Sequence, residues 1–457
     1  KNKINICYII FEKNMNSFNE KKNILESPNK SFLRRKWEKT LKDTIVKRIP
    51  KVFINNNLIT FINSEQQIND LIDPINSEKN KKIKIVVILT PLNNFTHLVG
   101  FLDKLDKILN EDTKIIINYC SKLWKPIFSL FSYCGLINSF KESVFFSKDT
   151  FINVFLQCTN YEISSQLSDI SLPFKIPFVT QFLSTIINIF PFLSLFSFAK
   201  IYYLRKRTKI ENEKKIMSLI IPCRNEEGNI SKILEEAKVR ISFPYQIVFV
   251  DDRSSDSTNK NMILETKKNK ELDIKIIKGN GEGKSRAVDL GVRNADGYYC
   301  AILDADLTVR MEDLNLFYSS ISIGNGDLIN GSRLIYKPQH RSMKLFNYFG
   351  NQFFAKLVTY ITSTKITDTL CGTKCFKKSD WEVFEEFRKI NNFKDIWGDF
   401  NIIFSAVYYG YKLVDLPVRY YERVSGETKM KRRFFYFLNM LTICISAYRI
   451  FKLNFIK

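Results

Sequence analysis

The stretch Tyr298–Thr308, with the sequence YYCAILDADLT, decides how the rest of the chain is interpreted. Its apolar run from Tyr298 to Leu303 predicts a buried strand that delivers Asp304 and Asp306 at its carboxyl end. Ligands of open α/β sheets bind at that end of the strands. Two carboxylates so placed can share a divalent cation, Mg2+ or Mn2+, which would stabilise a diphosphate leaving group. The alternative is a solvated acidic turn behind a core strand.

Composition sets broad limits. The chain has 457 residues, so two or three domains are expected, and 45% hydrophobic residues suffice for sizeable cores. The formal net charge of +23 suggests acidic partners such as nucleotide phosphates, anionic lipid or nucleic acid. Lys, Asn and Ile are enriched along the whole chain, however, so only local clusters of charge are informative.

Neither the cysteines nor the start of the sequence points to a particular function. Nine cysteines are scattered singly apart from Cys371 and Cys375, whose spacing fits no zinc signature, and only two His are present. Reduced thiols of an intracellular protein are the simplest interpretation. The chain starts at Lys1 rather than Met, as expected of a sequence that lacks its amino terminus, and shows no signal peptide.

The first half of the chain reads as a second α/β region. Residues 1–82 are rich in Lys and Asn and carry no compelling motif. We then expect strands at Ile83–Leu89 and Lys114–Asn118, and helices at Leu98–Leu109, Trp124–Cys134 and Lys148–Cys158. This alternation predicts a parallel sheet covered by helices.

The most hydrophobic stretch, Phe178–Tyr203, is not expected to span a membrane. A polar stripe recurs along it every three or four residues, at Gln181, Ser184, Thr185 and Asn188, and Pro191 interrupts it. A helix ending near Phe190 and a following strand fit better. The basic run from Arg205 to Lys209 then indicates a linker, with a domain boundary near residue 210.

After this boundary, strands alternate with acidic and Gly-rich loops. A strand at Met217–Pro222 runs into CRNEEGN and a helix at Ile230–Val239, and a strand at Gln246–Val250 ends in DDRSSDST. Asp256 or Ser257 is expected to cap the next helix. Capping does not explain Asp251 and Asp252, whose acceptor oxygens suit the N–H edge of a base or the hydroxyls of a ribose.

A Gly-rich loop, GNGEGKS at Gly279–Ser285, follows a strand at Ile274–Ile277 and opens a helix. It resembles a phosphate-binding P-loop, but the first Gly of that motif would fall on Lys278, and two βα units precede it. A P-loop-like NTPase therefore stays the alternative function. We expect Lys284 close to a diphosphate, although an ordinary tight turn and helix start would explain it too.

The last third of the chain supplies further polar loops. The stretch Asp327–Arg333 predicts a strand that leaves Arg333 to meet a phosphate bidentately, unless it is a solvated Arg. A long aromatic-rich helix is expected at Ser342–Ser363, and a helix from Asp399 to Tyr409. The last strand of the fold is expected at Tyr411–Tyr421.

Taken in order, these motifs resemble glycosyltransferase family 2, and within it the dolichyl- and polyprenyl-phosphate sugar synthases. The matching motifs are IIPCRNEE from Ile220, VDDRSSDST from Val250, GKSRAV from Gly283, LDADL from Leu303, GSRL from Gly331, DTLCGTK from Asp368, WGDF from Trp397 and LPVRYYERVSGETK from Leu416. The resemblance covers about residues 217–429 and implies a GT-A fold, a nucleotide-sugar donor and inversion at the anomeric carbon.

The resemblance also assigns residues. It places Asp304 and Asp306 on the metal and implies a nucleotide site formed by Pro222, Arg224, Asn225, Glu226, Asp251, Asp252, Lys284 and Asp304. Phosphate or acceptor contacts fall to Arg333, Asp368, Arg423 and Lys429. Where the lipid-phosphate synthases usually have Gln and then prolines, this chain has Thr308-Val-Arg310, which leaves a different donor or acceptor open.

Asp399 and Asp306 are the predicted catalytic residues. In an inverting transfer, a base must lie across the sugar from Asp304 and Asp306, and the resemblance puts Asp399 on the acceptor side. A hydroxyl acceptor needs such a base, whereas a phosphate is already ionised near neutral pH. The alternative role of Asp399 is an N-cap.

Two regions flank this domain. The run IIINYCSKLW at Ile115–Trp124 resembles a methyltransferase-like domain found fused ahead of certain glycosyltransferases. No G-x-G turn precedes Ile83 to approach S-adenosylmethionine, so we predict that this domain is degenerate and non-catalytic. At the carboxyl end, Phe434–Phe451 between Lys431–Arg433 and Lys452 predicts a helix in a membrane interface, or one packed on its own domain.

The sequence thus predicts an α/β protein with four parts: an undefined segment (1–82), an incomplete methyltransferase-like domain (83–210), a GT-A domain (211–430) and an amphipathic carboxyl-terminal helix (431–457). We expect a metal-dependent transfer from a UDP- or GDP-sugar to a polyprenyl-phosphate or glycan acceptor in cell-surface polysaccharide or glycoconjugate synthesis. The expected location is the cytoplasmic face of a membrane, with Mg2+ or Mn2+ and without a nucleic-acid partner. A non-catalytic nucleotide-binding protein is the other alternative.

Overall fold

The computed structural model describes residues 214–336, 345–391, 395–422 and 433–453 without a break. Among the first 213 residues it describes chiefly 39–46, 59–62, 85–88, 113–134, 159–170 and 196–207. The chain divides into two compact units: residues 1–160 with 168–202, and residues 161–167 with 203–457.

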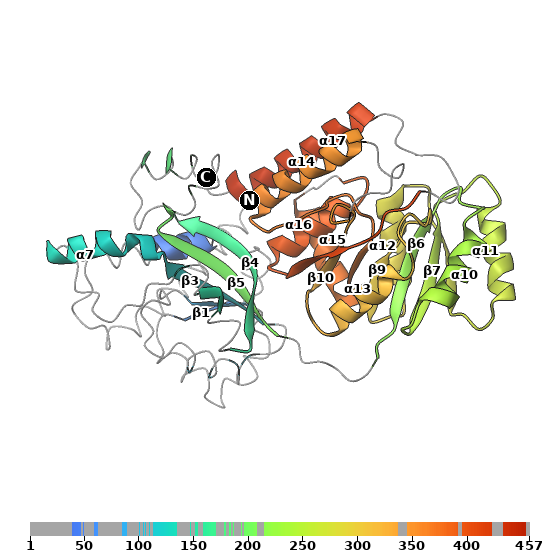
Figure 1. Ribbon diagram of the computed structural model, residues 1–457, viewed down its shortest axis with the longest axis horizontal. Coiled ribbons are helices and arrows are strands. Elements are labelled where there is room, and N and C mark those ends of the chain that lie inside the picture. The colour runs from blue at the N-terminus through green and yellow to red at the C-terminus, as the bar shows by residue number, and fades with distance from the viewer. Residues whose placement is uncertain are drawn as a thin grey trace, which may run out of the picture. The chain divides into compact units, whose positions relative to one another are not determined.

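The strands described before residue 207 form one sheet (Figure 1). Their order is β1 (Ile59–Ile62), β2 (Ile85–Ile88), β3 (Lys114–Cys120), β5 (Ala199–Lys206) and β4 (Tyr161–Ile170). The first three are parallel, and the sequence predicts this pairing for β2 and β3 but does not predict β1. A short η3 (Lys122–Trp124) leads into α7 (Lys125–Tyr133), close to the predicted helix. The methyltransferase-like interpretation stays a prediction.

Several expectations for the first half lie wholly or mostly outside the described residues. These are the helices at 98–109, 148–158 and 178–190. Strand β4 was missed by the sequence analysis, because polar residues such as Glu162, Ser164 and Ser165 interrupt its apolar pattern. These three side chains are nevertheless buried.

A second sheet organises the unit that contains the Asp-x-Asp stretch. Its described strands run in the order β12 (Leu413–Pro417), β10 (Leu328–Ser332), β11 (Lys374–Lys377), β9 (Tyr299–Ile302), β6 (Met217–Cys223), β7 (Tyr245–Asp251) and β8 (Ile274–Lys278). Neighbours pair in parallel except β11, which is antiparallel to both β9 and β10. The sequence predicts all of these strands except the four-residue β11.

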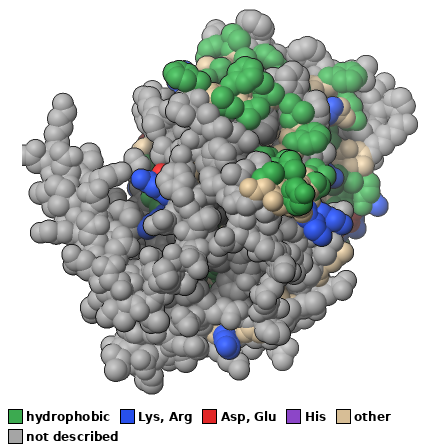
Figure 2. Space-filling model, turned by 90° about the vertical axis from the view of Figure 1, so that its left-hand side faces the viewer, with side chains coloured by type: hydrophobic (Ala, Val, Ile, Leu, Met, Phe, Trp, Pro, Cys, Tyr) green, Lys and Arg blue, Asp and Glu red, His purple; other side chains and the backbone are tan. Residues whose placement is uncertain are grey.

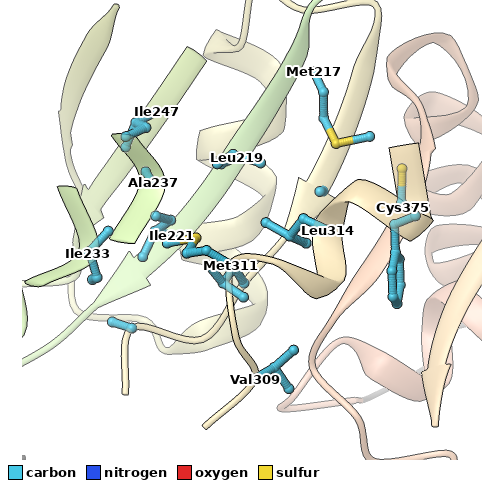
Figure 3. Close-up of a cluster of buried hydrophobic side chains, with 14 of the residues drawn as sticks. Met217, Leu219, Ile221, Ile233, Ala237, Ile247, Val309, Met311, Leu314 and Cys375 are labelled. Carbon is cyan, nitrogen blue, oxygen red and sulfur yellow. The ribbon is translucent and has the colours of Figure 1, made fainter. Parts of the chain in front are cut away.

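The helices of this unit alternate with the strands as far as β11, after which α15 and α16 follow each other (Figure 1). They are α10 (Ile230–Arg240), α11 (Thr258–Lys268), α12 (Lys284–Asn294), α13 (Asp313–Ser322), α14 (Leu345–Thr362), α15 (Trp381–Ile390), α16 (Asp399–Tyr408) and α17 (Arg433–Tyr448). One hydrophobic core joins β6, α10 and α13 through residues such as Leu219, Ile233 and Leu314 (Figure 3). Each such buried side chain contributes about 1.5–3 kcal/mol to stability.

Close packing fixes α12 against the sheet. A Cβ at Gly291 would lie 2.5 Å from Ile220 Cγ2 and 3.0 Å from Val250 Cγ2, so only a glycine lets the helix approach β6 and β7 this closely. Strands β6, β7 and β9 are parallel, and their carboxyl ends therefore meet at one edge. The amino-terminal residue of α12, Lys284, is thereby held at the edge where Asp251 and Asp304 emerge.

The carboxyl-terminal helix packs on its own unit. Figure 1 shows α17 beside α14, and the ring of Phe437 lies 5.4 Å from that of Phe354 and 6.2 Å from that of Phe353. Helix α17 continues into η6 (Arg449–Leu453), where Phe451 contacts Phe404 of α16. Within the described residues, no helix is long and apolar enough to cross a membrane.

Candidate active site

The loops after β6 and β7 are tied to each other. Asn225 has a left-handed backbone (φ 57°), its backbone N–H donates to Ser254 Oγ (3.0 Å), and its side-chain oxygen accepts from the backbone N–H of Ser255 (2.8 Å). The N–H of Glu226 donates to Thr258 Oγ1 (2.8 Å). The structure therefore brings Asn225 and Glu226 against the Asp251–Thr258 loop, as expected for parts of one site.

Asp252 organises the Gly-rich loop. Its Oδ1 accepts from the N–H of Gly281 (2.8 Å) and its Oδ2 from the N–H of Gly283 (2.9 Å). These two amides thus bind a carboxylate of the same chain and not an incoming phosphate, which is unlike a P-loop. The guanidinium of Arg224 is exposed and lies 4.0 Å from Asp252. Asp251 is buried and accepts from the N–H of Ser254 (3.0 Å).

Helices α11 and α16 begin in different ways. Ser257 is the N-cap residue of α11 but makes no side-chain capping hydrogen bond. The N–H of Thr258 donates instead to the carboxylate of Asp256 (3.0 Å). For α16, the N-cap is Gly398 in a left-handed conformation (φ 84°), and Asp399 is already inside the helix. Gly398, and not Asp399, is therefore the N-cap, which speaks against the alternative role of Asp399.

Asp304 is ion-paired with Lys284. Lys284 Nζ lies 2.8 Å from Asp304 Oδ1 and 3.7 Å from Asp399 Oδ2. Desolvation alone would raise the pKa of Asp304, but the ammonium of Lys284 outweighs it and the pKa is lowered. Desolvation would likewise lower the pKa of Lys284, and the carboxylates of Asp304 and Asp399 raise it instead. Both groups are thus held charged.

Asp306 points into the same loop cluster. Its Oδ1 accepts from the backbone N–H (3.2 Å) and the hydroxyl (2.8 Å) of Thr308. Within the described part of the chain, no group of three or more His, Cys, Asp or Glu side chains is arranged to hold a metal ion. Asp304 and Asp306 supply two hard oxygen donors, which suits Mg2+ or Mn2+, because these ions complete their shells with water and substrate phosphates.

Arg333 and Asp368 form a buried pair. Arg333 Nε and Nη2 donate to the two carboxylate oxygens of Asp368 at 2.8 and 2.9 Å. Burial alone would raise the pKa of Asp368, but Arg333 outweighs it and the pKa is lowered. The bidentate partner of Arg333 is therefore this aspartate, where the sequence analysis expected a phosphate. The guanidinium also lies over the ring of Tyr420, 5.2 Å from its centre.

Asp399 lies between two ammonium groups. Lys374 Nζ, on β11, is 3.0 Å from Asp399 Oδ1, and Lys284 approaches Oδ2 from the other side. The side chain of Lys374 is fully buried and also donates to the carbonyl of Cys371. A small pocket beside Asp399 is lined by Lys284, Trp397 and other residues of α12, α15 and α16.

The sequence analysis missed Lys374 and Asp395. Asp395 is buried and accepts from the N–H groups of Trp397 (3.0 Å) and Asn401 (2.9 Å), so it shapes the turn that presents Asp399. Burial, with a smaller contribution from Asp399, raises the pKa of Asp395 to about 6. Pro222 is the last residue but one of β6, whereas Arg423 and Lys429 lie outside the described residues.

Comparisons with known proteins define the class. The model of the glycosyl transferase family 2 matches residues 218–384. The chain is 28% identical over 187 residues to a dolichyl-phosphate beta-glucosyltransferase of Dictyostelium discoideum, covering 37% of this chain and 57% of that one. It is 27% identical over 172 residues to a low-salt glycan biosynthesis hexosyltransferase of Haloferax volcanii, covering 37% and 40%.

The chain belongs to glycosyl transferase family 2, and its second unit has the α/β GT-A fold that the sequence predicted. A solved structure that the chain matches is glucosyl-3-phosphoglycerate synthase from Mycobacterium tuberculosis, in complex with Mn2+, UDP and glucosyl-3-phosphoglycerate. The identity is 12%, the TM-score 0.38, and the match covers 51% of this chain and 80% of that one. The chain spans only 40–57% of the length of the two relatives named above.

Proposed function

We propose that this chain transfers a sugar, with inversion and with help from a divalent metal, from a nucleoside diphosphate donor to a polyprenyl phosphate. The observation that carries the proposal is the position of Asp304 and Asp306. They follow β9 at the carboxyl edge of a family 2 sheet, with the ammonium of Lys284 2.8 Å from Asp304. The edge of the sheet thus combines acidic groups for a metal with a cation for a diphosphate.

The interlocked loops after β6 and β7 would bind the nucleoside. Pro222 and Asp251 lie at the ends of β6 and β7, Asn225 and Glu226 lie in the loop after β6, and Asp252 holds the neighbouring Gly-rich loop in place. The diphosphate would then lie over the start of α12, where Lys284 can meet it. The pair of Arg333 and Asp368 contributes to the charge around Asp304, and Arg423 and Lys429 remain proposed phosphate contacts.

Asp304 and Asp306 would hold the metal. Their oxygens match the preference of Mg2+ and Mn2+ for carboxylates, with the rest of the shell left to water and phosphate. When bound, such an ion screens the diphosphate and polarises its bond to the anomeric carbon. Lys284 adds a second positive charge, so the electron pair of the breaking bond is accepted by a stabilised nucleoside diphosphate.

The acceptor side favours a phosphate. Asp399 Oδ1 faces the buried ammonium of Lys374 at 3.0 Å, so this oxygen is not presented to an acceptor hydroxyl. A phosphate oxygen is already charged and can attack the anomeric carbon without a base. The dolichyl-phosphate relative points the same way. A glycan hydroxyl, suggested by the hexosyltransferase relative, is the second candidate.

A lipid acceptor requires access to a membrane surface. Helices α14 and α17 lie side by side and expose Phe349, Phe353, Phe435, Leu438 and Ile445. Figure 2 shows several groups of exposed hydrophobic side chains on the face that it draws. Together with the basic run at 431–433 of the sequence, the exposed apolar side chains of α14 and α17 fit peripheral attachment to an anionic, cytoplasmic membrane face.

A transfer assay tests the proposal. The full chain is incubated with Mn2+, UDP- or GDP-linked radioactive hexoses, and either a polyprenyl phosphate or the corresponding polyprenol. We expect label in the lipid fraction with the phosphate and none with the alcohol. Label transferred only to the alcohol or to a glycan would refute the phosphate acceptor, and nucleotide hydrolysis without any transfer would refute the transferase.

A further inference from the structure

We propose that Lys284 is an internal cation that competes with a divalent metal for Asp304, and that it makes metal binding and nucleotide binding depend on each other. In the free protein the ammonium neutralises Asp304. When metal and nucleotide are bound together, the metal takes the carboxylate and the diphosphate takes the ammonium. This inference rests on the proposed function, because it uses Asp304 and Asp306 as the metal ligands.

The fold directs the ammonium at Asp304. Lys284 is the first residue of α12, and Gly291 fixes that helix against β6 and β7. The preceding residue, Gly283, is anchored by its N–H to Asp252 at 2.9 Å. The position of the lysine backbone is thus set from both sides, and the ion pair at 2.8 Å follows from the architecture.

The backbone at Gly372 also leaves little space around the ion pair of Asp304 and Lys284. A Cβ at Gly372 would lie 2.3 Å from Asp304 Oδ2 and 2.8 Å from Lys284 Nζ. A metal ion bound to Asp304 would sit about 2.0–2.1 Å from its ligand oxygen. An ammonium and a dication on one carboxylate would repel each other at short range. Metal binding therefore requires Lys284 to move.

After Lys284 has moved, Asp304 and Asp399 are left with different partners. Asp399 keeps the buried ammonium of Lys374 at 3.0 Å. Asp304 exchanges Lys284 for the metal, and its other nearby cations act only at longer range. The Lys284 side chain, at 25% exposure, is less enclosed than that of Lys374, at 0%, so it is the one of the two that can change partner.

The charges of the cluster explain why a nucleotide is needed. The cluster consists of the cations Lys284, Arg333 and Lys374 and the anions Asp304, Asp306, Asp368 and Asp399. A dication alone displaces the ammonium of Lys284 from Asp304 without giving it a new partner, whereas a nucleoside diphosphate supplies an anionic partner for it. The two ligands should thus bind synergistically.

Calorimetric titration of Mn2+ into the full chain, with and without UDP or GDP, tests this coupling. The decisive variant is Lys284→Met, which removes the competing charge. The matched control is Lys275→Met, because Lys275 also pairs with an aspartate, Asp296 at 3.0 Å, outside the cluster. For the wild type and the control, we expect the nucleotide to tighten Mn2+ binding by about tenfold or more.

For Lys284→Met, we expect Mn2+ alone to bind about tenfold more tightly than to the wild type, and the added effect of nucleotide to shrink. A metal that merely bridges protein and diphosphate would also give synergy, but it would not make the lysine variant bind metal better. Unchanged or weaker Mn2+ binding by Lys284→Met would overturn the inference. Should that variant not fold, Lys284→Gln gives the same readout with a smaller change.

The wild type separates this inference from the proposed function. If it binds neither UDP nor GDP with Mn2+, the proposed donor site fails and the coupling fails with it. If it binds both ligands without mutual enhancement, the transferase proposal stands and only the role of Lys284 is refuted.

Discussion

Two carboxylates at the same edge of the sheet, Asp252 after β7 and Asp304 after β9, are neutralised in different ways. Asp252 accepts from two backbone amides, those of Gly281 and Gly283. Asp304 pairs with a side chain, the ammonium of Lys284. Backbone amides cannot leave without refolding the loop, whereas a lysine head can move by side-chain rotation. Asp252 therefore has a structural role, whereas Asp304 is free to exchange its partner for a ligand.

The largest expected effect concerns Asp399, whose partner Lys374 is fully buried. The variant Lys374→Met leaves Asp399 without this partner and should lower the free energy of unfolding by about 3–5 kcal/mol. Chemical denaturation measures this difference. The double variant Lys374→Met, Asp399→Asn should recover part of the loss, because no unpaired charge is left. A single variant as stable as the wild type would show that the pair is not structural.

The variant Asp304→Asn tests whether Asp304 serves as a ligand site and not as a structural group. Loss of one charged oxygen should reduce sugar transfer by at least about 100-fold, since a stabilising group of the transition state is removed. The melting temperature should change little, because Lys284 keeps Asp399 as a neighbour. Activity is followed with labelled nucleotide sugar. Near wild-type transfer would exclude Asp304 as a metal ligand.

Asp252→Asn should behave in the opposite way. An amide group can accept only one of the two N–H bonds that Asp252 accepts now, so one loop amide is left unsatisfied. We expect a loss of about 1–3 kcal/mol in the free energy of unfolding. Denaturation curves of Asp252→Asn and Asp304→Asn, recorded side by side, make the comparison direct. Equal stabilities of the two variants would contradict the distinction between a structural Asp252 and an exchangeable Asp304.

The sequence predicts the strands that carry these carboxylates because each is an apolar run that ends abruptly in acidic residues. It also predicts Asp304, Asp306 and Asp399 as parts of one site. It misses Lys374, which lies on a four-residue strand whose register becomes visible only when β11 pairs with β9 and β10. No local pattern distinguishes a buried, paired lysine from the many exposed lysines of this chain.

The partner of Arg333 shows the same limit. Its fork was expected to face a phosphate, but the structure places Asp368, 35 positions later in the chain, at 2.8 and 2.9 Å. A motif indicates that an arginine is needed, whereas its partner depends on which loops the sheet brings together. Asp395 was missed for a related reason, because its role is to accept backbone N–H groups within its own turn.

The smallest expected effect is the pH dependence of stability that Asp395 causes, and this residue can be compared directly with Asp252. Like Asp252, it accepts from two backbone amides, yet burial, with a smaller contribution from Asp399, raises its pKa from 3.8 to about 6. The folded state therefore binds a proton more tightly than the unfolded state, and stability falls as the pH rises from about 4 to about 6 and stays lower above it. Between pH 5 and 7, the loss should be about 1 kcal/mol.

The variant Asp395→Asn removes this titration. Denaturation of the wild type and the variant at pH 5, 6 and 7 isolates the contribution of Asp395, because the other groups titrate alike in both proteins. We expect the stability difference between them to shift in favour of the variant as the pH rises. A difference that is constant with pH would mean that Asp395 is charged throughout, as we infer for Asp304. The hydrogen bonds from the two backbone amides would then suffice to keep the buried carboxylate of Asp395 charged, even beside the charge of Asp399.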